Sequence, residues 1–217
     1  MVHNGDGTID ESHNGMVAPG ILAMADCLEP ESANRNSIDL AVGYATALGA
    51  DVTILDLRDL ELPTYDPKRE IAALPQGAYA FRQLLCAHDG LLIALPTREQ
   101  DCPPLLLNAV AWSMCPAFGA DATAAYTGKC AALVPAKSGE DVFGQYAGDV
   151  SASLSQLGVL IVPEALSGSG ARRDAKSSGG ENAARTLEDQ MNRFVHTIRW
   201  AQARAADGFA VDDDGAP

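Results

Sequence analysis

The polar segment that follows the first apolar run combines side chains that hold an anion with side chains that repel one. It covers residues 25–36, reads ADCLEPESANRN, and follows the apolar run of residues 20–24. Ser32 and Asn34 could bind a phosphate together with the backbone N–H groups of a helix N-terminus, but both are also common N-cap types, and capping is the simpler interpretation. The segment also has three carboxylates: Asp26, Glu29 and Glu31. It is therefore a phosphate site by position and a poor one by charge.

Two later segments also place polar residues after an apolar run. Residues 96–104 read PTREQDCPP, and residues 136–145 read AKSGEDVFGQ. Arg98 could bind an anionic ligand or the phosphate of a nicotinamide cofactor. A solvated arginine, or one paired with Glu99 or Asp101, is the simpler interpretation.

The sequence gives no support to other catalytic or metal chemistry. Its five cysteines form no CxxC pair and its four histidines have no HxxxH or HExxH spacing, which argues against a disulfide framework or a zinc site. Cys102 could be a redox-active thiol, but it has no basic or histidine neighbour in the sequence to activate it, so an inert cysteine is favoured. No Ser-His-Asp, GxSxG, P-loop or GxGxxG pattern indicates a hydrolase, an NTPase or a Rossmann protein.

The charge balance restricts the possible partners. Lys and Arg total 15 against 29 Asp and Glu, a net charge of −14, so neither nucleic acid nor an anionic membrane surface is an expected partner. The N-terminus has no basic region followed by an apolar one, and no apolar run reaches the ~20 residues of a membrane helix. We therefore expect a cytoplasmic protein.

The chain is expected to form one domain between two tails. Its 217 residues and 22.7 kDa fit a single core. Residues 1–16 and 207–217 are polar and are predicted to be flexible tails, the second one acidic, while residues 17–206 form the domain. Residues 167–185 are poor in apolar side chains and are predicted to form a mobile loop.

Strand and helix patterns alternate along this domain. The predicted strands cover residues 20–26, 51–57, 91–96, 129–136 and 159–166. The predicted helices cover residues 37–48, 78–90, 105–114, 146–158 and 181–206. Since most of these strands are apolar on both faces, the pattern predicts an α/β three-layer sandwich with a parallel sheet, in the flavodoxin-like order 2-1-3-4-5. Ligands of such folds bind at the carboxyl ends of the strands, which is where the three polar segments begin.

Four stretches of the chain resemble the NADPH-dependent FMN reductases. They are LDLRDLELPTYD at 55–66, HDGLLIALP at 88–96, CPPLLLNAVAW at 102–112 and YTGKCAALVPAKSG at 126–139. The middle block is the most specific, with Pro96, Asn108 and Trp112 among the matching positions. The resemblance implies the flavodoxin-like fold, bound FMN, NAD(P)H as electron donor and self-association as a dimer or tetramer. The site residues that it implies are Ser32, Asn34, Pro96, Thr97, Arg98, Glu99, Ser138 and Gly139.

The flavin loops depart from the family pattern. Similar proteins read Gly-Ser-x-Arg-x-x-Ser-x-Asn in the first loop, where this chain has Asp26 and Cys27 in place of Gly-Ser and Glu29 in place of the arginine. In the second loop, Arg98 stands where an aromatic ring packs on the flavin, and Glu99 and Gln100 replace Asn and Gly. In the third loop, a glycine pair is replaced and two further acidic residues follow Gly139. Ordinary FMN affinity is not expected from these residues.

Three functions are consistent with these observations. The first is an NAD(P)H-dependent oxidoreductase in which FMN carries electrons to a flavin, a quinone or a similar acceptor. The second is a flavin-free homologue, a pseudoenzyme that acts as a binding or regulatory partner. The third is a changed preference for a neutral or cationic small molecule.

Two further residue sets have open interpretations. Trp112 is either an anchor in a dimer interface or a core residue. Asp56, Asp59 and Glu61 are interpreted as a solvated strand edge rather than as acid and base catalysts.

Overall fold

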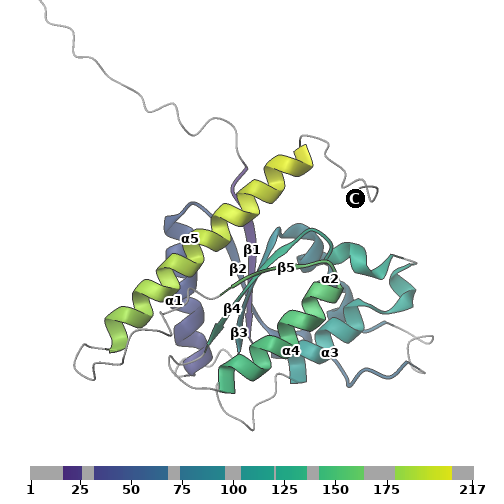
Figure 1. Ribbon diagram of the computed structural model, residues 1–217. Coiled ribbons are helices and arrows are strands. Elements are labelled where there is room, and N and C mark those ends of the chain that lie inside the picture. The colour runs from purple at the N-terminus through teal and green to yellow at the C-terminus, as the bar shows by residue number, and fades with distance from the viewer. Residues whose placement is uncertain are drawn as a thin grey trace, which may run out of the picture.

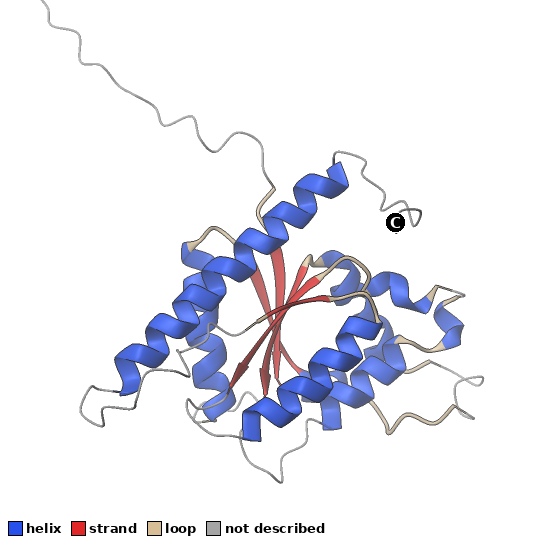
Figure 2. Ribbon diagram, in the orientation of Figure 1, coloured by secondary structure: helices blue, strands red, loops and turns tan. Residues whose placement is uncertain are grey.

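The computed structural model contains one five-stranded parallel sheet with helices on both faces, as Figures 1 and 2 show. It describes residues 17–25, 32–67, 74–95, 104–119, 121–135, 142–163 and 179–206. The strand order β2-β1-β3-β4-β5 confirms the predicted flavodoxin-like fold.

The elements alternate along the described part of the chain. The strands are β1 (Gly20–Ala25), β2 (Asp51–Asp56), β3 (Gly90–Leu95), β4 (Cys130–Pro135) and β5 (Leu160–Val162). The helices are α1 (Ala33–Ala47), α2 (Gln76–Ala87), α3 (Pro104–Ser113), α4 (Val142–Gln156) and α5 (Gly179–Ala206). Short 3-10 helices are η1 (Leu57–Leu60), η2 (Pro116–Phe118) and η3 (Ala122–Ala125).

Alternate residues of the central strands supply two separate cores. In β1, Leu22 and Met24 belong to the cluster that also contains Phe81 of α2. Ile21 and Ala23 point to the opposite face, in the cluster that contains Phe194 of α5. Figure 1 accordingly shows α1 and α5 on one side of the sheet and α2, α3 and α4 on the other. This two-sided burial explains why β1, β3 and β4 are continuous apolar runs in the sequence.

Several elements begin or end away from their predicted positions. Helix α1 starts at Ala33 rather than at residue 37, because Ser32 caps it. The predicted loop over residues 167–185 is too long, since α5 already starts at Gly179. Strand β5 has three residues where eight were predicted, and Pro163 after it has no backbone N–H to continue the ladder. The predicted tails, residues 1–16 and 207–217, lie outside the described residues.

The thiol of Cys130 gives the fold a predictable pH dependence. Cys130 is 1% exposed at the start of β4, and its burial, with a smaller contribution from the Asp89 charge, raises its pKa from 9.0 to about 11. The unfolded chain therefore loses this proton at a lower pH than the folded chain does. The free energy of unfolding therefore falls by about 2 kcal/mol as the pH rises from below 9 towards about 11, because deprotonation of this thiol favours the unfolded chain.

The test compares wild type with Cys130→Ala by urea unfolding at intervals from pH 8 to 11. The variant should lose about 2 kcal/mol less stability over this range than wild type does. The matched control is Cys86→Ala, which removes an exposed thiol and should follow the wild-type curve. Parallel curves for wild type and Cys130→Ala would contradict the prediction.

Candidate functional site

Three strands of the sheet end side by side at its carboxyl edge. Strand β1 ends at Ala25, β3 at Leu95 and β4 at Pro135, and the register pairs Met24 with Ile93 and Leu95 with Pro135. The three polar segments of the sequence therefore start from one edge, as predicted.

Most of the predicted site residues follow these strands directly in sequence. Pro96, Thr97, Arg98, Glu99, Ser138 and Gly139 lie outside the described residues, as do the carboxylates Asp26, Glu29 and Glu31. Their roles stay predictions. Ser32 and Asn34 are described, and the structure places both at the N-terminus of α1.

Ser32 is the N-cap of α1. Its backbone is extended, and its Oγ accepts a hydrogen bond from the backbone N–H of Arg35 at 3.1 Å. This confirms the capping interpretation. No acidic residue lies in the first turn of the helix, while Arg35 forms an ion pair with Asp39 at 2.9 Å on an exposed face. The positive end of the helix dipole is thus left without a carboxylate from α1 itself, which favours an anion there.

Asn34 has a buried polar atom without a partner. Its Oδ1 is buried, yet no described residue donates a hydrogen bond to it. An unsatisfied buried acceptor costs about 1–3 kcal/mol, so native proteins rarely leave one. The position of this atom, two residues after the N-cap, suits a hydroxyl or N–H donor that arrives from a ligand at the carboxyl edge.

Ser37 fastens the N-terminal half of α1 to the end of β4. Its Oγ donates to the carbonyl oxygen of Pro135 at 2.7 Å, a contact between residues 98 apart in sequence. Gln190 attaches α5 to the same strand, since its Nε2 donates to the Leu133 carbonyl oxygen at 3.0 Å. Sequence reasoning missed both residues. A usable signal was present, since each is a polar residue four positions before a buried residue on the same helix stripe, Ala41 and Phe194 respectively.

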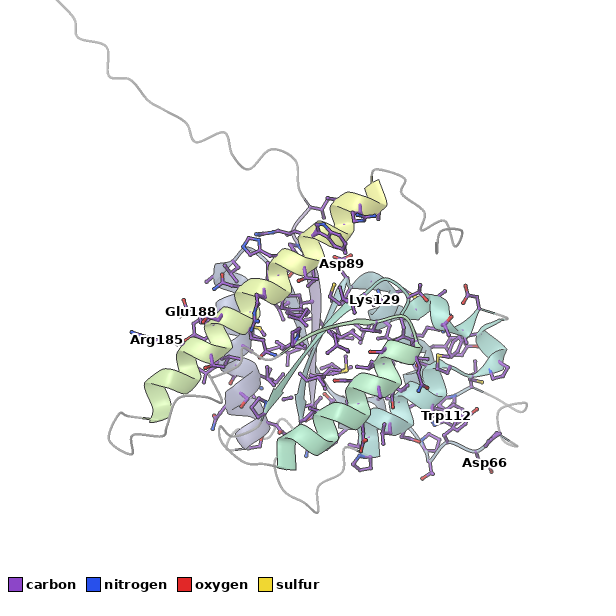
Figure 3. All side chains as sticks on the ribbon, viewed as in Figure 1. Asp66, Asp89, Trp112, Lys129, Arg185 and Glu188 are labelled. Carbon is purple, nitrogen blue, oxygen red and sulfur yellow. The ribbon has the colours of Figure 1, made fainter. Side chains whose placement is uncertain are left out.

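Trp112 is a core residue of the chain. It is 2% exposed, its Nε1–H donates to the Pro63 carbonyl at 2.7 Å, and its ring meets that of Tyr65 edge-on with centroids 5.2 Å apart. The structure thus excludes the alternative in which Trp112 is an exposed interface anchor. Figure 3 shows Trp112 between α3 and the segment that carries Asp66.

Asn108 completes the attachment of this segment to α3. Its Oδ1 accepts from the backbone N–H of Tyr65 at 2.8 Å, and its Nδ2 donates to the Pro63 carbonyl at 3.0 Å. Asn108 and Trp112 are four residues apart, so both face the segment from one side of the helix. Two of the positions that match the family pattern therefore serve to hold residues 63–65 on α3, the helix that begins after the β3 loop.

The carboxylate of Asp56 has a structural role. It accepts from the backbone N–H of Arg58 at 3.0 Å, which caps η1, and pairs with the Arg58 guanidinium at 2.7 Å. Its side chain is 13% exposed, which is less than expected for a solvated edge, whereas Asp59 and Glu61 are exposed as predicted. Gly77 of α2 lets η1 pack closely, because a Cβ there would lie 1.9 Å from the Leu60 carbonyl oxygen.

A second polar cluster lies at the opposite, amino edge of the sheet. Asp89 Oδ2 accepts from the Gly20 backbone N–H at 2.9 Å and from Gln202 Nε2 at 2.8 Å, while Lys129 Nζ donates to the His88 carbonyl. Burial lowers the pKa of Lys129, and the nearby Asp89 charge opposes that shift. Figure 3 shows Asp89 and Lys129 near the C-terminal end of α5. Their hydrogen bonds join the starts of β1, β3 and β4, which gives this cluster a structural role.

The described residues contain neither a candidate membrane span nor a candidate metal site. None of the helices in the described ranges combines the length and apolar character needed to cross a bilayer. Within the same ranges, no group of three or more His, Cys, Asp or Glu residues is arranged to hold a metal ion.

The chain is similar to one protein family and to several solved structures. The family model described as NADPH-dependent FMN reductase matches residues 19–172. FerB, a flavoenzyme NAD(P)H:(acceptor) oxidoreductase from Paracoccus denitrificans, has a similar structure, with a TM-score of 0.67, 19% identity and coverage of 85% of this chain and 99% of that one. RosB, solved with a bound 8-demethyl-8-formylriboflavin-5'-phosphate intermediate, has a TM-score of 0.62 and 18% identity, with 92% and 91% coverage.

A third structure is an oxidoreductase from Corynebacterium diphtheriae, with a TM-score of 0.56, 17% identity and coverage of 86% and 98%. At these identities the three likenesses establish the fold. No curated protein is similar enough in sequence to count as a match.

Proposed function

The chain belongs to the NADPH-dependent FMN reductase family, and from this premise we propose that it is an NAD(P)H-dependent oxidoreductase that reduces a flavin, a quinone or a similar small acceptor through bound FMN. The observation that carries the proposal is the buried Oδ1 of Asn34, which lacks a donor among the described residues and lies at the carboxyl edge. FMN has ribityl hydroxyl groups that can donate to such an atom.

The described part of the site fits this cofactor. Ser32 caps α1 and Ser37 fixes the helix against β4, so the helix N-terminus is held in place before any ligand arrives. Residues 63–65 are held on α3 by Asn108 and Trp112. When bound, FMN supplies the two-electron chemistry between nicotinamide and acceptor, and the part of the protein is to bind, orient and exclude water.

The alternative is a flavin-free homologue that acts as a binding or regulatory partner. The observation that favours it is the charge of the first loop, in which Glu29 replaces the family arginine and Asp26 precedes it. If those carboxylates face the ligand, they oppose the FMN phosphate. A neutral or cationic small molecule would then suit the same edge better.

The proposal is tested by adding FMN, or riboflavin, to the purified protein and following flavin fluorescence and NAD(P)H consumption with a quinone acceptor. We expect saturable flavin binding and flavin-dependent NAD(P)H consumption. Asn34→Ala should weaken FMN and riboflavin binding alike, by about tenfold, because one hydrogen bond to the ribityl chain is lost. Asn36→Ala, which removes an exposed asparagine from the same helix, is the matched control and should bind as wild type does.

The opposite result would select the alternative. A protein that binds neither flavin and gives no flavin-dependent NAD(P)H consumption is a flavin-free homologue. Equal flavin binding by wild type and Asn34→Ala would show that Asn34 does not contact the flavin, and the proposal would lose its main support.

We also propose that the protein is cytoplasmic and self-associates, as a homodimer or tetramer, through α3. Leu107 on this helix is 44% exposed although most of the helix is apolar, which is consistent with such a contact. Sedimentation equilibrium of wild type and Leu107→Glu would measure it.

A further inference from the structure

An apolar groove lies between β5 and the outer face of α5, on a side of the molecule that the proposed function does not use. Its volume is about 520 Å³, and β5 with Pro163 forms one wall. Arg193, His196, Thr197 and Trp200 of α5 form the other. Two of its side chains are unusually exposed for their type, Leu160 at 50% and Trp200 at 57%. Exposed apolar side chains next to a strand edge are normally covered or are sites of association.

The charge of this groove is opposite to that of the chain. The protein has a net charge of −14, yet none of the described residues that line the groove carries a carboxylate. Its ionisable side chains are Arg193 and His196, and Arg204 lies over the Trp200 ring at 5.0 Å. The groove therefore suits an occupant with apolar side chains followed by negative charge.

The sequence that follows α5 has this composition. Helix α5 ends at Ala206, and residues 207–214 read DGFAVDDD. Asp-Gly is a turn signal, and glycine shortly after a helix end commonly redirects the chain. Three apolar residues follow it, and then three aspartates. Residues 164–178, which also lie next to β5 in sequence, carry Arg172, Arg173 and Lys176 and match a cationic groove less well.

The spacing of the two segments also matches. Along α5, at ~1.5 Å per residue, Trp200 is about 9 Å and Arg193 about 20 Å before Ala206. A chain that turns back at Gly208 and extends at ~3.3 Å per residue brings Val211 to about 10 Å and Asp214 to about 20 Å. Val211 thus reaches the level of Trp200, while Asp213 and Asp214 reach the level of His196 and Arg193.

We propose that residues 207–214 fold back along α5 and dock in this groove of the same chain. Phe209 and Val211 cover Trp200 and Leu160, and the aspartates pair with Arg193 and His196. The docked segment shields the exposed side of β5 and its neighbouring tryptophan from contact with other molecules.

The test uses the full chain and the accessibility of Trp200 to acrylamide, a neutral quencher of tryptophan fluorescence. Trp112 is 2% exposed, so quenching reports mainly Trp200. The triple variant Asp212→Asn, Asp213→Asn, Asp214→Asn should be quenched about twofold more strongly than wild type, since the segment no longer covers the ring. Phe209→Ser should act in the same direction.

The control removes three charges elsewhere: Asp6→Asn, Asp10→Asn and Glu11→Gln should leave the quenching at the wild-type level. Salt at about 1 M should raise quenching in wild type and leave the triple variant unchanged, because it screens the ion pairs that the variant lacks. Equal, salt-independent quenching of wild type and triple variant would overturn the proposal. Protection that is lost on dilution would also overturn it, in favour of docking into a second copy.

Discussion

Replacing Trp112 with Ala is expected to lower the free energy of unfolding by about 3–5 kcal/mol, the range measured for removal of a large buried aromatic side chain. The ring is 2% exposed, packs edge-on against Tyr65, and donates through Nε1 to the Pro63 carbonyl. Its loss leaves a cavity and removes one of the contacts that hold residues 63–65 on α3, while the two hydrogen bonds of Asn108 remain. Urea unfolding of wild type and variant measures the difference.

Two further variants separate the contributions at this position. Trp112→Phe keeps most of the ring volume, and Asn108 Nδ2 still donates to the Pro63 carbonyl, so its cost should be about 1–2 kcal/mol. Tyr79→Ala removes an aromatic side chain that is 51% exposed and should cost about 1 kcal/mol or less. If Trp112→Ala unfolded as wild type does but no longer self-associated, Trp112 would be an interface residue and the core assignment would be wrong.

The double variant Glu29→Arg, Asp26→Gly is expected to bind FMN at least tenfold more tightly than wild type, with riboflavin binding nearly unchanged. Two unit charges ~4 Å apart at an effective dielectric of ~20 interact by ~4 kcal/mol, and ~1.4 kcal/mol is a factor of ten in affinity. Replacing a repulsion by an attraction of this size should raise the affinity for FMN more than tenfold, even after screening. Only FMN responds, because only its phosphate carries the charge.

Flavin fluorescence quenching or calorimetry with both ligands measures this effect. Wild type should bind FMN no better than riboflavin, and added salt should weaken FMN binding in the variant but not in wild type. Asp51→Arg reverses a charge at the opposite edge of the sheet, at the start of β2, and should leave FMN binding unchanged. If wild type bound FMN much more tightly than riboflavin, the carboxylates would have to face away from the phosphate.

The sequence by itself determined the class and order of the elements. The apolar runs of β1, β3 and β4 predicted strands that are buried on both faces, and the resemblance to the family supported the order that the structure shows. These features depend on periodicity and on the polarity of neighbouring residues, which are local properties. Ser32 belongs to the same group, since an N-cap bonds a backbone N–H only three residues away.

Only the tertiary structure decided which polar side chains hold the candidate site together. Ser37 bonds Pro135 across 98 residues, Gln190 bonds Leu133 across 57, and Asn108 bonds Tyr65 across 43. It also decided that Trp112 is a core residue, since an apolar helix position can face either its own domain or a partner. A sequence pattern shows which face of a helix a side chain occupies, but the atom it meets depends on how distant segments pack, because hydrogen bonds need contact within about 3 Å.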